Sequence, residues 1–303
     1  MNAKLVITLV LLTTTLPAFS QEKIIFIKDS VTHEPVPFAA IQFADKKGGI
    51  YSNEIGQAVL PDSIRRILIS QIAYHTREVE IEPAPSPITI LLTPALNQLP
   101  EVLVSNMPSK RKKIGLLKPK GSFGVISTPN TNFALFIPFD PAWKQQPAIT
   151  SIIAYLNSIN GNEKYPVIKS SIRFDLRLPD TKGQPSNVSL LKEPIVHPSE
   201  KRYHGRETVH LPRPVPFPSK GVFIVVDCII PAQILIVEQR QIISPTICCT
   251  GSSTSEQTWS RTITNDFTWR KMNWHDPAWA GIIKSFYGEN GVINLRAGLE
   301  IAY

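Results

Sequence analysis

Few residues in this chain of 303 have the type and spacing that catalysis requires. The nearest approach is His75-Thr76-Arg77-Glu78, because a His and a Glu three residues apart can supply two ligands to a catalytic zinc ion. However, the segment alternates like a strand, and side chains three apart on a strand point to opposite faces. A zinc site also needs a third ligand. We therefore predict no metal site and no cofactor.

Other catalytic patterns are missing from the sequence. There is no Gly-x-Ser-x-Gly elbow for a serine nucleophile and no glycine-rich phosphate loop. His204 and His210 flank Arg206 and Glu207 in a polar stretch that we expect to be a loop. Nothing singles out a pair of carboxylates for glycoside hydrolysis. We therefore predict no catalytic residue and expect that the protein is not an enzyme.

The three cysteines are Cys228, Cys248 and Cys249. Cys228 lies in the apolar run 222–230, which is typical of a buried strand. Adjacent residues on a strand point to opposite faces, so one of Cys248 and Cys249 could face Cys228. Two interpretations stay open, a disulfide from Cys228 to either partner and three partly buried thiols.

Aromatic residues gather near the C-terminus, at Trp259, Phe267, Trp269, Trp274 and Trp279. Exposed, coplanar indoles could stack on sugar rings, as in a carbohydrate-binding module. Large aromatic side chains more commonly fill a core, since each buries a large apolar area. We expect the core role and keep carbohydrate binding as an alternative function.

The first third of the chain consists of short apolar segments separated by turns. Each is bounded by polar, Gly or Pro turns, and Asn53-Glu54-Ile55-Gly56 is a hairpin turn with Gly56 at a position of positive φ. The alternation predicts seven short strands, at residues 24–27, 38–43, 50–52, 57–60, 67–72, 76–81 and 88–92. Seven closely spaced strands favour a sandwich.

The strand pattern returns after residue 131. Residues 168–178 give the clearest half-buried strand, because Ile172, Phe174, Leu176 and Leu178 share one face. Arg173, Asp175 and Arg177 share the other. Further strands are expected at 133–139, 149–156, 190–191, 195–196, 222–230, 234–237 and 295–301. The sequence therefore predicts an all-β protein with two sandwich domains, the second resembling a jelly roll.

The chain divides into four segments by composition. Residues 1–20 have a basic start, an apolar core and the small-x-small site Ala18-Phe19-Ser20, which is typical of a signal peptide. The first domain then covers 21–104, a basic linker 105–122, and the second domain 123–303. No later stretch is apolar enough to span a membrane.

The net charge of +8 is concentrated in the linker, at Lys110-Arg111-Lys112-Lys113 and Lys118-Pro119-Lys120. Aromatic residues are not interleaved there. A solvated linker explains the run better than a nucleic-acid partner does, and export argues against such a partner as well.

The first domain resembles the carboxypeptidase-like regulatory domain, a transthyretin-like sandwich of envelope proteins in the Bacteroidota. The resemblance rests on Glu34-Pro35-Val36-Pro37, Asn53-Glu54-Ile55-Gly56 and Leu99-Pro100-Glu101-Val102-Leu103-Val104. Ala73-Tyr74 departs from the pattern, because the family has Gly before the Tyr.

The second domain resembles the C-terminal β-sandwich that accompanies this domain in such proteins. The matching elements are the alternating strand from Arg173, Gly183-Gln184-Pro185, Leu190-Leu191, 220–226, Trp259-Ser260-Arg261 and Trp269-Arg270-Lys271-Met272.

Together the resemblances imply an exported, non-catalytic accessory protein in the periplasm or at the outer membrane. Its partner would be an outer-membrane uptake protein or a glycan. The alternatives are a carbohydrate-binding module and an envelope hydrolase.

Overall fold

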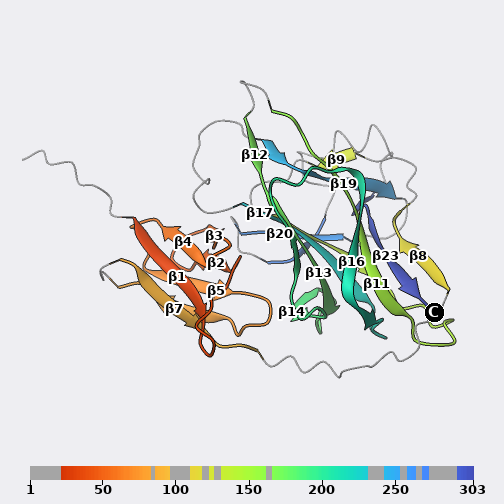
Figure 1. Ribbon diagram of the computed structural model, residues 1–303, viewed down its shortest axis with the longest axis horizontal. Coiled ribbons are helices and arrows are strands. Elements are labelled where there is room, and N and C mark those ends of the chain that lie inside the picture. The colour runs from red at the N-terminus through yellow and green to blue at the C-terminus, as the bar shows by residue number, and fades with distance from the viewer. Residues whose placement is uncertain are drawn as a thin grey trace, which may run out of the picture.

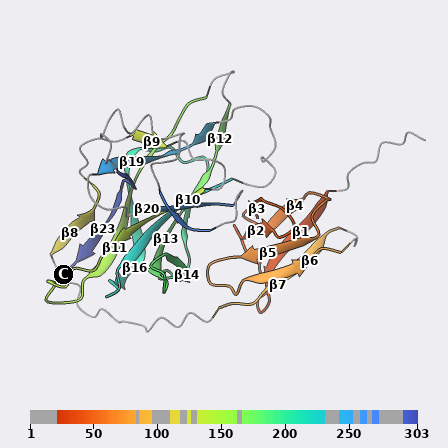
Figure 2. The ribbon, with the colours of Figure 1, turned by 180° about the vertical axis from the view of Figure 1, so that it is seen from behind.

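The computed structural model describes residues 22–82, 86–95, 110–117, 123–125, 131–161, 166–230, 242–252, 258–263, 268–272 and 292–303. These residues form strands and no helix, which confirms the predicted all-β class. The chain forms two β-domains that lie side by side, a smaller N-terminal one and a larger C-terminal one (Figures 1 and 2). The predicted signal peptide, residues 1–20, and the motif at 99–104 lie outside the described residues.

The N-terminal domain contains the seven predicted strands in two sheets. One sheet has the order β4-β1-β7 and the other β3-β2-β5-β6, with β1 antiparallel to β4 and parallel to β7. Aliphatic side chains from both sheets form a single core between them. The strands are β1 (Lys23–Asp29), β2 (Ala40–Phe43), β3 (Gly49–Tyr51), β4 (Gln57–Leu60), β5 (Arg66–Ser70), β6 (Arg77–Glu80) and β7 (Ile88–Leu92).

The predicted turn at Asn53–Gly56 forms, but it joins β3 of one sheet to β4 of the other, so the expectation of a hairpin was wrong. Asn53 Oδ1 accepts hydrogen bonds from the backbone N–H of Ile55 at 3.1 Å and of Gln57 at 2.8 Å. Gly56 has a φ of +69°, and a Cβ there would lie 2.5 Å from the carbonyl oxygen of Ile27. Both the torsion and the close approach require glycine.

Ala73 and Tyr74 form the turn at which the sequence departs from the family pattern. Ala73 has a φ of 71°, in the left-handed region that favours glycine. The turn places Tyr74 so that its hydroxyl donates to Asp29 Oδ2 at 2.9 Å. Asp29 Oδ1 in turn accepts from the N–H groups of Val31 and Thr32. Tyr74 thus ties the β5–β6 connection to the end of β1.

The C-terminal domain is built from two larger sheets. One has the order β14-β13-β17-β10-β20-β21, with β15 beside β13, and the other β22-β19-β11-β23-β8, with β16 beside β11 and β9 beside β19. A short parallel pair joins β12 to β18. The strands are β8 (Arg111–Gly115), β9 (Phe123–Val125), β10 (Thr131–Ile137), β11 (Ala148–Asn157), β12 (Val167–Lys169), β13 (Ser171–Pro179), β14 (Pro185–Ser189), β15 (Ile195–His197), β16 (His204–Pro216), β17 (Val222–Ile229), β18 (Ile242–Ser244), β19 (Thr246–Ser252), β20 (Thr258–Thr262), β21 (Arg270–Lys271), β22 (Val292–Leu295) and β23 (Ala297–Ala302).

The interpretation of 204–210 as a loop was wrong. His204, Arg206, Glu207 and His210 lie on β16, a 13-residue strand that pairs with β11. β16 pairs along one side, and such a strand tolerates proline because its other backbone edge needs no ladder partner. The polar character of 204–210 was the basis of the loop interpretation.

The segment predicted as a basic linker, 105–122, also contains a strand. Arg111–Gly115 form β8 and pair with β23, so this part belongs to the C-terminal domain. Arg111 and Lys113 both contact the carboxylate of Glu300, at 3.0 and 3.8 Å. Backbone pairing needs no apolar side chains, which is why a basic sequence can hold an outer strand. Residues 101–109 and 118–122 lie outside the described residues.

Candidate binding site at the domain junction

One face of β13 carries charged side chains that are fully buried. Ile172, Phe174 and Leu176 face the core, as predicted. Arg173 and Arg177, on the opposite face, are only 4% and 2% exposed. The expectation of a half-buried strand was therefore wrong, because the N-terminal domain covers the polar face of β13.

The buried charges are held in ion pairs. Arg173 contacts Asp227 Oδ2 through Nε at 2.8 Å and Nη2 at 2.7 Å. Arg177 Nε donates to Asp175 Oδ2 at 2.7 Å. Asp175 Oδ1 also accepts from the hydroxyl of Ser189 at 2.5 Å. The guanidinium groups therefore have fixed orientations, which is what a preformed site requires.

Polar contacts join the two domains across this face. Arg173 Nη1 donates to the carbonyl oxygen of Phe38 at 3.1 Å. The Tyr51 hydroxyl, which is buried, lies 3.3 Å from Nδ2 of Asn132 on β10. Apolar side chains of both domains pack around these contacts, in one cluster of Phe38, Ala40, Tyr51, Ile229 and Ile263.

Gly49 shows how closely the domains approach each other. A Cβ on this residue of β3 would lie 2.6 Å from Cγ1 of Ile263, in the C-terminal domain. That distance is shorter than side chains tolerate, so the absence of a side chain at Gly49 permits the contact.

Arg261, on β20, adds a third guanidinium group to the junction. Its Nε donates to Asn132 Oδ1 at 2.9 Å, and the guanidinium lies 4.4 Å from the centre of the Trp269 ring. Burial and the neighbouring charge of Arg177 lower the pKa of Arg261 to about 9. The group therefore stays charged at neutral pH.

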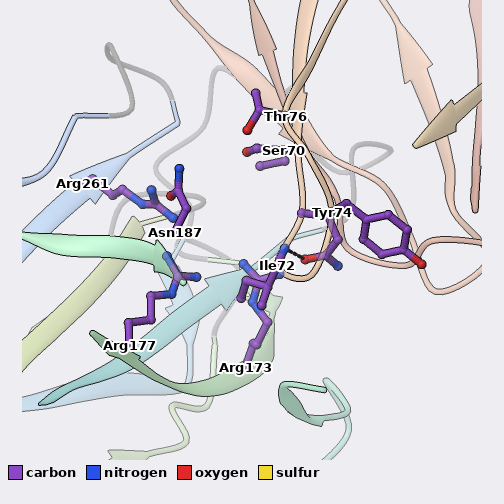
Figure 3. Close-up of a pocket in the computed structure, with 10 residues that line it drawn as sticks. Ser70, Ile72, Tyr74, Thr76, Arg173, Arg177, Asn187 and Arg261 are labelled. Atoms are coloured by element: carbon purple, nitrogen blue, oxygen red, sulfur yellow. Dashed lines mark hydrogen bonds between the residues drawn. The ribbon is translucent and has the colours of Figure 1, made fainter. Parts of the chain in front are cut away.

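A pocket lies between the domains where these arginines meet the N-terminal domain (Figure 3). Its empty volume is about 360 Å³, part of which opens to solvent. In Figure 3 the side chains of Arg177, Asn187 and Arg261 gather on one side and Ser70, Ile72 and Thr76 on the other, while the Tyr74 ring points away. The lining residues are Ala40, Ser70, Gln71, Ile72, Tyr74, Thr76, Arg173, Arg177, Asn187 and Arg261.

The pair suggested as zinc ligands does not contribute to this site. His75 and Glu78 are both exposed, and Glu78 forms a surface ion pair with Arg66 at 3.5 Å. Val79 and Ile81 turn inward, as the alternation predicted. Within the described ranges, no group of three or more His, Cys, Asp and Glu side chains could hold a metal ion.

The described tryptophans do not form an exposed row. Trp269 is buried beneath Arg261, and Trp259 is half-buried beside Lys271. Both pack on the outer face of the β10–β17 pair. Phe267, Trp274 and Trp279 lie outside the described residues. The expectation of packed rather than sugar-facing indoles therefore holds for Trp259 and Trp269.

The cysteines are buried and no disulfide joins them. Cys228 and Cys249 both face the core of the C-terminal domain, as alternation on β19 allows. Cys248 faces the other way and accepts a hydrogen bond from Nδ2 of Asn157 at 3.3 Å. Burial raises the pKa of Cys249, so its thiol stays protonated and unreactive.

A second polar cluster lies between β15 and β16. Lys201 Nζ donates to Glu207 Oε1 at 2.6 Å and lies 3.2 Å from Nδ1 of His197. His197 stacks on the Tyr203 ring. Burial, and then the charge of Lys201, lower the pKa of His197. The imidazole is therefore neutral at pH 7. Through Lys201, the cluster links His197 of β15 to Glu207 of β16.

No family model and no curated protein matches the chain. Two solved structures are similar at low identity, both of Cwp84. One is the clostridial cysteine protease after propeptide cleavage, with 12% identity and a TM-score of 0.39 over 63% of this chain and 40% of that one. The other contains the cysteine protease and lectin-like domains of Cwp84, a surface layer associated protein of Clostridium difficile, with 11% identity and a TM-score of 0.40 over 64% and 36%. The chain thus spans less than half the length of these structures.

Proposed function

We propose that the protein is an exported, non-catalytic binding and interaction protein of the cell envelope. The chemistry of the junction pocket carries the proposal. Its described lining supplies guanidinium, amide and hydroxyl groups but no carboxylate, imidazole or thiol. The Ser70 and Thr76 hydroxyls therefore have no carboxylate or imidazole beside them in that lining to act as a general base. The described lining can thus orient a ligand, and it supplies no activated nucleophile.

The envelope location rests on the sequence. A basic start, an apolar core and a cleavage site after Ser20 are the features that direct export. Resemblance to the carboxypeptidase-like regulatory domain supports the same location and an association with outer-membrane uptake systems. Within the described part of the chain, no helix has the length and apolarity to cross a membrane.

Fractionation of the native host, combined with intact-protein mass spectrometry, tests the proposal. We expect the protein in the periplasmic or outer-membrane fraction, with Gln21 at its N-terminus. We also expect no turnover of chromogenic peptidase, esterase and glycosidase substrates. An intact Met1 in the envelope fraction would contradict cleavage. Turnover that disappears in a variant of a described side chain would contradict the non-catalytic role.

A further inference from the structure

Arg177 presents free hydrogen-bond donors to the junction pocket. Its Nε is engaged by Asp175, but no described residue bonds to Nη1 or Nη2, although the side chain is only 2% exposed. Neither Nη atom is among the fully enclosed atoms that lack a partner, so both reach the open space of the pocket, where water or a ligand can accept from them. The feature therefore indicates a site for an acceptor.

Two neutral groups complete the donor set. The side chains of Asn187, on β14, and Ser70, on β5, line the same pocket and make no hydrogen bond to a described residue. Figure 3 shows the Asn187 amide next to the Arg261 guanidinium and above that of Arg177, with Ser70 across the pocket. An amide N–H and a hydroxyl can each donate to an oxygen ligand.

Charge and shape together select the ligand class. Arg173, Arg177 and Arg261 give the wall a positive potential, which favours an anion. Asp175 and Asp227 lie directly behind two of these arginines and disfavour a doubly charged ligand. A flat carboxylate matches the two Nη donors of a guanidinium, whereas a tetrahedral dianion needs more donors and more charge.

We propose that the junction pocket binds the carboxylate group of a small organic acid. The carboxylate lies against Nη1 and Nη2 of Arg177 and accepts further hydrogen bonds from Asn187 and Ser70. This inference rests on the proposed binding function and names its ligand class. Because both domains line the pocket, binding also stabilises their association.

Thermal unfolding of the full mature chain tests the inference. The probes are acetate, its neutral isostere acetamide, inorganic phosphate and chloride, compared at constant pH and ionic strength. We expect acetate to raise the unfolding midpoint in a saturable way and the other probes to give no saturable shift, because phosphate stabilises folded proteins only by its exclusion from their surface. Saturation-transfer NMR on acetate then gives the dissociation constant.

Asn187→Asp is the informative variant, because it places a carboxylate in the pocket at an exposed position that the core does not need. We expect acetate binding to weaken at least ~10-fold. Asn160→Asp makes the same charge change at an exposed residue outside the lining, and it should bind like wild type. Ser70→Ala should weaken binding less than Asn187→Asp does.

Three outcomes would overturn the inference: equal stabilisation by acetamide, a stronger saturable stabilisation by phosphate, or unchanged acetate binding in Asn187→Asp. None of them alters the fractionation and turnover results, so failure of the ligand class is distinct from failure of the proposed function.

Discussion

The buried pair of Arg173 and Asp227 gives the sharpest test of how the domain junction is held. Arg173 is 4% exposed and Asp227 fully buried, with two contacts of 2.7 and 2.8 Å between them. Removing one partner leaves a buried charge uncompensated, which costs about 3–5 kcal/mol. Arg173→Met also removes the hydrogen bond to the Phe38 carbonyl.

Each single variant, Arg173→Met and Asp227→Asn, should therefore lower the free energy of unfolding by about 3–5 kcal/mol. The double variant leaves no unpaired charge, so its cost should fall short of the sum by about 2–3 kcal/mol. Urea unfolding followed by fluorescence and circular dichroism measures the four free energies and checks that the transitions coincide.

A matched cycle on the surface supplies the control. Arg66 and Glu78 lie 3.5 Å apart with half-exposed side chains, so Arg66→Met and Glu78→Gln should couple by less than about 1 kcal/mol. The coupling free energy of Arg173 and Asp227 should exceed that of the surface pair. If the two coupling energies are equal, the buried ion pair does not stabilise the domain junction.

Three further predictions concern other parts of the chain. Ala73→Gly should stabilise the protein by about 0.5–1 kcal/mol in urea unfolding, because φ at Ala73 is 71°; a loss of stability would contradict strain there. Backbone N–H donors, and then Tyr74, hold the pKa of Asp29 below its ordinary value of 3.8, so its stabilising effect is present above that pH and lost as the pH falls. Asp29→Asn should thus flatten the acid side of the stability curve, and an unchanged slope would refute this. Trypsin should cut after Lys112, in β8, more slowly than after Lys47, in an exposed turn, whereas equal rates would count against the β8–β23 pairing.

The sequence predicted the N-terminal domain well, because its signals are local. Alternating apolar residues mark each strand, and the Asn53 and Gly56 turn has a side-chain and a torsional requirement that the structure satisfies. Such signals depend on neighbours within a few residues, so they survive without knowledge of the fold. The same holds for the inward face of β13.

The candidate site depends on long-range packing, and the sequence does not show it. Arg173, Asp175 and Arg177 alternate with apolar residues as they would on any strand with one solvated face. What covers that face is set by the docking of Phe38 and Tyr51, more than 100 residues away in the chain. The one available signal was an alternating strand whose polar side was charged throughout.

We propose that the two domains together form a carboxylate site. Whether an acetate ion occupies the junction pocket tests this directly. A crystal structure of the mature protein grown with acetate, and a second one with acetamide, makes the measurement. We predict a planar acetate within hydrogen-bond distance of Arg177 Nη1 and Nη2 and of the Asn187 amide, and only water there in the acetamide crystal. Acetate bound elsewhere, with the junction filled by water in both crystals, would contradict it.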